Sequence, residues 1–152
     1  PWGRDRIRTP AGERTADEQQ ALDAWEEGLS LVLDQLGSDG VPVVVLGEVP
    51  GYPDSFPRER LSVLRPTATP PSRSATEVRD KHRSIQAVER AAVERAGQAA
   101  YVDPLPAFCD DECATYLDGS WLYYGADDLT VAGGKLLSPA IGRALDAVAT
   151  PG

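Results

Sequence analysis

A helical pattern, a tight turn and an apolar run follow one another in residues 18–46, and this order constrains the fold more than any other feature. Apolar side chains recur at helical spacing before Gly37, at Leu22, Trp25, Leu29, Val32, Leu33 and Leu36. The pattern predicts an amphipathic helix with Thr15 as N-cap, Glu18 at N3 and Trp25 in the core. Residues 41–46 are a continuous apolar run, typical of strands buried on both faces. A helix, a short turn and a buried strand form half of a parallel α/β unit.

Later segments repeat this alternation. Residues 75–96 have the spacing of a second helix, and residues 99–102 have the composition of a short strand. A last helix is predicted to begin near Thr130, which is a good N-cap, and Ser138-Pro139 either restarts or kinks it.

These segments together predict an α/β fold, a parallel sheet flanked by helices. A chain of 152 residues suits one apolar core, so residues 1–152 are expected to form a single domain. A doubly wound sheet normally has about five strands. Either a further strand lies in residues 1–9, or the domain is incomplete at its N-terminal side. Residues 47–74 interrupt the pattern as a long proline-rich loop, and such loops are commonly functional.

The composition excludes some classes of partner. The net charge is −9 and the pI is near 4.5, so we expect no nucleic-acid partner and no anionic membrane surface. No apolar run approaches the roughly 20 residues that cross a bilayer, and the first residues do not have the pattern of a signal peptide. No cofactor is indicated.

Cys109 and Cys113 are the only cysteines of the chain. Three states are possible for this pair: a local disulfide, two free thiols, or half of a metal site. The single histidine is distant in sequence, which disfavours zinc, and we expect no metal. A disulfide is favoured, and it would indicate an oxidising compartment.

Short motifs follow one another in a fixed order through the last third of the chain. They are Tyr101-Val102-Asp103-Pro104, the Cys109 and Cys113 pair, Asp118-Gly119, Leu122-Tyr123-Tyr124 and Leu129-Thr130-Val131-Ala132-Gly133, with residues 40–46 and Pro50 upstream. This order resembles the SGNH (GDSL-like) hydrolase domain, in the form fused to membrane acyltransferases that O-acetylate cell-envelope polysaccharides. Ligands of an open parallel sheet bind beyond the carboxyl ends of its strands, and the loop after Val102 carries most of these motifs.

The resemblance implies an SGNH or flavodoxin-like domain of an extracytoplasmic acyl-ester enzyme, in the periplasm or at the cell surface. The implied reaction is transfer of an acyl group, here acetyl, to cell-surface glycan. A glycan or an acyl donor would be the substrate, and a membrane acyltransferase domain of the same parent protein would be the partner. Cys109 and Cys113 would be the disulfide-forming pair of the family.

The departures from the family pattern concern the catalytic groups. Asp128 stands where the catalytic His is expected, and Gly125 stands where the Asp three residues earlier belongs. The Gly-Asp-Ser block of the nucleophile is absent between residues 1 and 41. A serine hydroxyl needs a general base, and an exposed Asp is a weak one unless burial raises its pKa. Asp128 and Asp127 are therefore the candidate catalytic residues, and the isolated chain is expected to be inactive.

A degenerate, non-catalytic domain that binds glycan or a partner is the alternative function. A third possibility, a cytoplasmic α/β binding protein with free thiols, is disfavoured because the cysteines fit the family pair.

His82, the clustered carboxylates, three aromatic residues and the serines are further candidates for site residues. His82 lies in a charged stretch, so it is expected to be a solvated surface residue and not a displaced base. The carboxylates could hold a hard cation, but a solvated acidic loop is the simpler interpretation. Trp121, Tyr123 and Tyr124 could lie in the core or stack on a sugar. No serine has a nucleophile motif. The acidic residues are Asp110, Asp111, Glu112, Asp127 and Asp128, and the serines are Ser55, Ser62, Ser72, Ser74 and Ser120.

Overall fold

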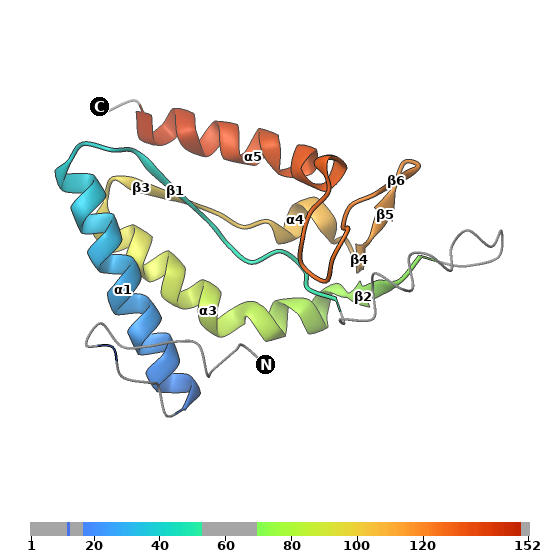
Figure 1. The fold of residues 1–152 in the computed structure, drawn as a ribbon, viewed down its shortest axis with the longest axis horizontal. Helices are drawn as coiled ribbons and strands as arrows, with labels where there is room; N and C mark the ends of the chain where they lie inside the picture. The colour runs from blue at the N-terminus through green and yellow to red at the C-terminus, as the bar shows by residue number, and fades with distance from the viewer. Residues whose placement is uncertain (1–11, 13–16, 53–69, 150–152) are drawn as a thin grey trace. The chain divides into compact units, whose positions relative to one another are not determined.

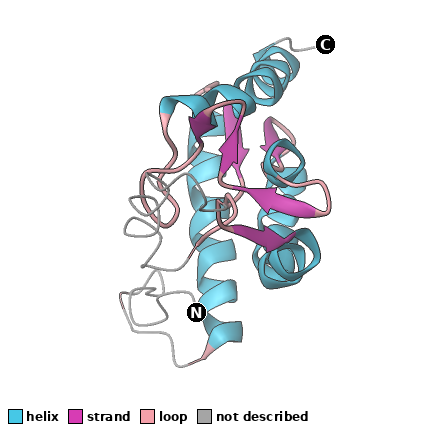
Figure 2. Ribbon diagram, turned by 90° about the vertical axis from the view of Figure 1, so that its right-hand side faces the viewer, coloured by secondary structure: helices cyan, strands magenta, loops and turns pink. Residues whose placement is uncertain are grey.

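A computed structural model describes residues 12, 17–52 and 70–149 of the chain (Figure 1). The helices are α1 (Glu18–Ser38), α3 (Ala75–Ala96), α4 (Leu105–Phe108) and α5 (Val131–Ala149). The strands are β1 (Val43–Leu46), β2 (Ser72–Ser74), β3 (Ala99–Val102), β4 (Glu112–Ala114), β5 (Tyr116–Leu117) and β6 (Ser120–Trp121). Figure 2 shows the strands as short arrows among much longer helices. The strand considered for residues 1–9 and most of the proline-rich loop lie outside the described residues.

The α/β prediction is confirmed. Strands β1 and β3 pair in parallel, with Val43 opposite Ala99 and Leu46 opposite Val102. The amide of Gly47 continues this pairing by donating to the Val102 carbonyl at 3.0 Å. The sheet has only two strands within the described part of the chain, which is consistent with an incomplete parallel sheet.

The described residues divide into two compact units. The first unit comprises Pro1–Gly47, Arg83–Val102 and Arg143–Gly152, and the second comprises Glu48–His82 and Asp103–Gly142. Helices α3 and α5 contribute residues to both units.

Helix α1 of the first unit begins later than its sequence pattern suggested. Asp17 is the N-cap, with its Oδ1 accepting from the Gln20 amide at 2.8 Å. The predicted capping box fails because Glu18 opens the helix, and Thr15 lies outside the described residues. The prediction that Trp25 lies in the core is wrong, since it is 39% exposed. The small residues Ala21 and Ala24 take the buried positions around it, and a pattern of large apolar residues does not include them.

The first unit has a small core. Leu33, Ala92 and Val93 are buried there, and β1 and β3 pack against them with half-buried side chains. Leu46 at the end of β1 is 41% exposed, so burial of this strand on both faces is not observed. A strand next to a single partner leaves one edge and much of its surface uncovered.

The second unit has the larger core and holds both cysteines. Its antiparallel pairs are β2 with β4, and β5 with β6. The predicted Asp118-Gly119 turn is confirmed as the tip of the β5–β6 hairpin, where both residues have positive φ, 48° and 81°. Positive φ at both central residues is what a tight hairpin turn requires. The sequence did not indicate β2, β4 or α4, which are too short to show a period.

Helix α5 runs through Pro139 and does not restart there. Ser138 Oγ donates to the Gly134 carbonyl at 3.2 Å, on the turn before the proline. Thr130 caps the helix as predicted, since its Oγ1 accepts from the Gly133 amide at 3.2 Å. None of the helices in the described ranges has the length and apolar character needed to cross a membrane.

Candidate functional site

The loop after β1 and the segment before α5 meet in the second unit. The Tyr52 amide donates to the Ala126 carbonyl at 2.7 Å. The rings of Tyr52 and Tyr123 meet edge to face, with centroids 5.0 Å apart. Both rings are buried, so two segments that are distant in sequence share one core. The Gly125 to Asp128 block is therefore held next to residues 48–52.

Residues 124–128 form a closed turn. The Tyr124 amide donates to the Asp128 carbonyl at 3.0 Å, and Tyr123 and Leu129 form a bridge behind it. A Cβ added to Gly125 would lie 2.5 Å from Asp128 Oδ2. The Asp128 carboxylate thus folds back over Gly125 and occupies the space that a side chain at position 125 would need.

Asp127 and Asp128 are both exposed. Their predicted catalytic role stays a prediction.

The residues that follow the turn have clear structural roles. Thr130 Oγ1 donates to the Trp121 carbonyl at 2.6 Å while it caps α5. Leu129 packs against the core of the second unit. A Cβ on Gly133 would lie 2.3 Å from the Leu122 carbonyl oxygen, so only glycine fits where α5 crosses this segment. These three residues fix the chain that follows the turn.

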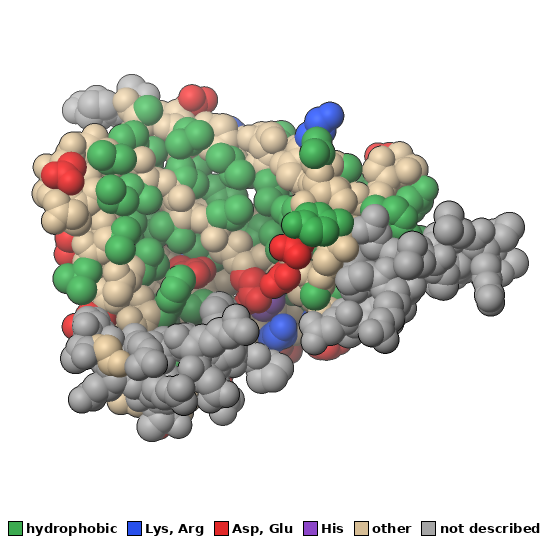
Figure 3. Space-filling model, viewed as in Figure 1, with side chains coloured by type: hydrophobic (Ala, Val, Ile, Leu, Met, Phe, Trp, Pro, Cys, Tyr) green, Lys and Arg blue, Asp and Glu red, His purple; other side chains and the backbone are tan. Residues whose placement is uncertain are grey.

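His82 is fully buried on α3, with 0% of its surface exposed, so the prediction of a solvated surface residue is wrong. Helix amphipathicity explains the error, because the charged neighbours Lys81 and Arg83 lie on the exposed side while position 82 faces inward. Figure 3 shows acidic and basic side chains gathered around the single histidine. Neither ring nitrogen makes a hydrogen bond of good geometry within the described residues.

Burial lowers the pKa of His82 to about 4, because desolvation disfavours the imidazolium. The positive charges of Lys81 and Arg73 act in the same direction, whereas Asp103 and the backbone of Glu48 oppose them. His82 is therefore neutral at physiological pH.

Glu48 stands directly against His82. Its Oε2 lies 3.5 Å from His82 Nε2 and is shielded from solvent, whereas the side chain as a whole is 32% exposed. Burial raises the pKa of the Glu48 carboxyl, and the charge of Asp127 raises it further, while Lys81 opposes both effects. Asp127 of the segment before α5 therefore acts electrostatically on the residue that faces His82.

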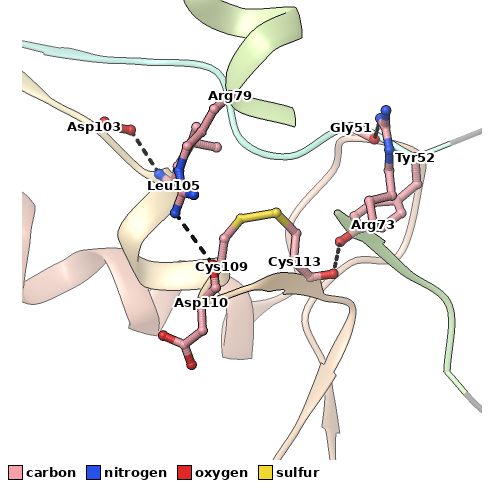
Figure 4. Close-up of a disulfide and its surroundings, with 9 residues drawn as sticks. All are labelled: Gly51, Tyr52, Arg73, Arg79, Asp103, Leu105, Cys109, Asp110 and Cys113. Carbon is pink, nitrogen blue, oxygen red and sulfur yellow. Dashed lines mark hydrogen bonds between the residues drawn. A yellow bond between two sulfur atoms is a disulfide. The ribbon is translucent and has the colours of Figure 1, made fainter. Parts of the chain in front are cut away.

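Cys109 and Cys113 form a disulfide with an S–S distance of 2.09 Å (Figure 4). Both cysteines are buried in the core of the second unit. The Tyr52 hydroxyl donates to the Cys113 carbonyl at 2.9 Å, so the bridge is fastened to the loop after β1. Arg73 supports the same loop, because its Nη1 donates to the Gly51 carbonyl at 2.6 Å.

The two tyrosine hydroxyls near the disulfide are shielded from water. Desolvation raises the pKa values of Tyr52 and Tyr123, so both hydroxyls keep their protons. The Leu105 amide donates to Asp103 Oδ1 at 3.0 Å, which opens the short helix that leads to Cys109. A shallow pocket of about 130 Å³ lies beside the bridge and is lined by residues that include Pro106, Asp110, Glu112 and Leu117.

Residues 2–143 match the family of SGNH domains that are fused to AT3 domains. The chain is an SGNH domain. The match spans nearly the whole sequence and confirms the resemblance drawn from the motifs. No curated protein and no solved structure matches the chain significantly.

The structure of this SGNH domain separates the retained residues of the motif from the altered ones. Leu129 packs against the core, Thr130 caps α5, and Gly133 allows α5 to approach the Leu122 segment closely. All three match the family motif. The sequence comparison with the family motif predicts that Gly125 and Asp128 stand at its acid–base positions, and this assignment stays a prediction.

The other candidates take varied places in the SGNH domain. Tyr123 lies in the core, and Tyr124 is exposed. Trp121 is half-buried, and its ring contacts the Tyr116 ring with centroids 5.2 Å apart. No three ligand-type side chains converge as a metal site in the portion that the structure describes. Asp110, Asp111 and Glu112 are exposed, as are Ser72, Ser74 and Ser120, while Ser55 and Ser62 lie outside the described residues.

Sequence reasoning missed Glu48 altogether. A signal was available, because Glu48 is the first charged residue after β1 and therefore lies at the carboxyl end of a parallel strand. Its partner His82 is distant in sequence, and only the packed structure brings the two together.

Proposed function

We propose that this SGNH domain belongs to an extracytoplasmic acyl-ester enzyme that transfers an acyl group, most simply acetyl, to cell-surface glycan. Its parent protein would carry the membrane acyltransferase domain that supplies the acyl group. The domain would bind the glycan acceptor or the acyl donor at the loop after β1 and the turn at residues 124–128.

The observation that carries this proposal is the family match over residues 2–143, in a family defined by its fusion to AT3 domains. The hydrogen bond from the Tyr52 amide to the Ala126 carbonyl supports the location, because it joins the loop after β1 to the turn at residues 124–128. The buried Cys109–Cys113 disulfide supports an oxidising, extracytoplasmic compartment.

The isolated chain should form no acyl-serine intermediate. The residue that would activate a serine is Asp128, which is exposed, and Gly125 offers no side chain to orient a base. Treatment with p-nitrophenyl acetate followed by intact-mass measurement tests this. The mass should stay unchanged, and hydrolysis should match a control that was blocked with a serine reagent.

A non-catalytic domain that binds glycan or a protein partner is the second candidate. The favouring observation is that Asp128 fills the space over Gly125, which leaves no room for a side chain at position 125. Ester hydrolysis above the serine-blocked control would remove this candidate.

Binding of glycan is measured directly by amide chemical shifts. De-O-acetylated fragments of cell-envelope glycan should shift amides of residues 48–52 and 123–130. A variant with Tyr124→Ala should bind more weakly, because an exposed aromatic ring is a stacking surface for a sugar. Leu117→Ala, an exposed apolar change on the hairpin, is the matched control. Unchanged spectra at saturating fragment would refute glycan as the ligand.

A further inference from the structure

The observation that needs an explanation is the pairing of Glu48 with His82. A fully buried imidazole without a good hydrogen bond is costly, because a desolvated polar group loses its contacts with water. Here both ring nitrogens and the facing Glu48 oxygen have no such partner among the described residues. Buried polar groups of this kind are uncommon and concentrate where chemistry or strain requires them.

The pair has a buried member and a solvent-facing member. His82 is 0% exposed, whereas about a third of the Glu48 side chain, 32%, is accessible. Oε2 faces His82 Nε2, so the accessible part is the remainder of the side chain. In acid–base pairs, one group contacts the reactant, and the second group orients the first without contacting the reactant. The geometry gives Glu48 the first role and His82 the second.

The backbone that follows Glu48 is held in place by three features. Pro50 is buried, the Tyr52 amide is bonded to Ala126, and the Gly51 carbonyl accepts from Arg73. Glu48 is therefore presented at a defined place beside the turn that holds Gly125 and Asp128. The Nε2 to Oε2 separation of 3.5 Å exceeds a normal hydrogen bond, as is common for acid–base pairs before the reactants bind.

We propose that Glu48 is the general base of this SGNH domain and that His82 is the buried residue that positions it. The pair takes over the function that the altered dyad at Gly125 and Asp128 has lost. This assignment rests on the proposed acyl-transfer function for its substrates, an acyl ester as donor and a sugar hydroxyl as acceptor.

The reaction needs no serine nucleophile. The Glu48 carboxylate removes the proton of the acceptor hydroxyl while the hydroxyl oxygen forms a bond to the acyl carbonyl carbon. The carbonyl electron pair moves to its oxygen, and the tetrahedral adduct then collapses. The bond from the carbonyl carbon to the donor oxygen breaks, and protonated Glu48 returns its proton to the leaving alcohol. Acyl ester and alcohol exchange partners, and the carboxylate is regenerated.

The charges around the pair suit this role. Lys81, on the same helix as His82, places its Nζ 3.9 Å from the point where a Cβ on Gly51 would stand, so a cation lies beside the loop. Burial keeps His82 neutral, Lys81 and Arg73 act in the same direction, and Asp103 and the Glu48 backbone oppose them. Burial raises the pKa of Glu48 against the opposing charge of Lys81, and Asp127 adds to the rise, which makes the carboxylate a stronger base than an exposed one.

The first test uses His82 itself as a reporter, because it is the single histidine of the chain. Its ring signals, followed by NMR against pH, should show a second inflection from ionisation of Glu48. Glu48→Gln should remove that inflection, and Glu112→Gln, an exposed glutamate of the same unit, should leave it in place. A His82 titration that is identical in the wild type and Glu48→Gln would overturn the pairing.

The second test measures transfer from p-nitrophenyl acetate to chitotetraose, with glycerol as a second acceptor and mass spectrometry of the products. Glu48→Gln should lower acceptor-dependent transfer by about 100-fold or more, whereas Glu112→Gln should not. The rate should rise with pH through an inflection above the usual glutamate pKa of about 4.3. His82→Leu removes the polar neighbour of Glu48 and should move the inflection to higher pH. His82→Gln keeps a polar side chain there and should return the inflection close to its wild-type pH. Circular dichroism establishes that each variant is folded.

The outcomes separate this assignment from the proposed function. Glu48-dependent transfer to glycerol but not to chitotetraose supports the base and refutes the glycan acceptor. Transfer to chitotetraose that survives Glu48→Gln supports the acceptor and overturns the base. Absence of transfer to either acceptor also overturns the base, and an inflection unmoved by His82→Leu overturns the role of His82.

Discussion

Replacing Gly133 with alanine should destabilise the SGNH domain, although alanine normally favours a helix. The added Cβ would lie 2.3 Å from the Leu122 carbonyl oxygen and 3.1 Å from Leu129 Cδ2. The first of these atoms is backbone, so α5 or the Leu122 segment has to move. That carbonyl also accepts from the Thr130 amide at 2.9 Å, and a shift would weaken this bond.

The size of the effect follows from two opposing terms. Overpacking in a rigid place costs about 1–3 kcal/mol, and the hydrogen bond to Leu122 adds about 1 kcal/mol if it is lost. The helix propensity of alanine over glycine returns up to about 1 kcal/mol. The net expectation is a loss of about 1–3 kcal/mol in the free energy of unfolding, or a fall in Tm of roughly 2–12 °C for a domain of this size.

Gly134→Ala is the matched control. It lies next to Gly133 on the same helix, but an added Cβ meets nothing within 4 Å. It should raise the stability by a few tenths to about 1 kcal/mol. Urea denaturation of both variants, followed by circular dichroism, gives the difference. Equal stabilities of Gly133→Ala and Gly134→Ala would refute the argument that close packing requires glycine at position 133.

Three other perturbations test the core, the bridge and the buried histidine. Tyr52→Phe removes the hydroxyl that donates to Cys113, so urea denaturation should show a loss of about 1–2 kcal/mol, and an unchanged midpoint would contradict a buried hydrogen bond. Cys109→Ser with Cys113→Ser opens a loop of sequence separation 4 and should cost roughly 2 kcal/mol. Thiol titration of the denatured, unreduced protein should find no free thiol, and two free thiols would remove the argument for an oxidising compartment. His82 has a folded pKa of about 4, below its unfolded value of 6.5, so its contribution to stability is complete above pH 6.5 and is lost as the pH falls towards 4. The full effect is roughly 3 kcal/mol, partly offset because the raised pKa of Glu48 favours the folded state as the pH falls. A His82→Gln variant should show a shallower decline over this range, and an equal decline would contradict burial of a neutral imidazole.

Much of the local structure could be predicted from the sequence. The helices over residues 75–96 and from Thr130, the strand at residues 99–102 and the Asp118-Gly119 turn depend on periodicity, capping and turn chemistry, which are local. Thr130 and Gly133 of the family block serve backbone geometry that permits few substitutes.

Errors appeared where burial depends on partners that are distant in the chain. Trp25 fits an apolar stripe, yet it is exposed because the neighbouring alanines take the buried positions. His82 lies among charged residues, yet its helix turns it inward. Periodicity gives the direction of a side chain only to within a wide arc, and one residue along a helix is a rotation of about 100°.

The sequence by itself therefore determined the α/β class and the SGNH family, because these follow from local patterns and residue identities. The tertiary structure alone brought Glu48 to 3.5 Å from His82 and removed the imidazole from water. Such a pair depends on how a loop after one strand packs against a helix, where His82 follows Glu48 by 34 residues. Sequence spacing carries no information about that contact, since side-chain packing and desolvation arise only in the folded chain.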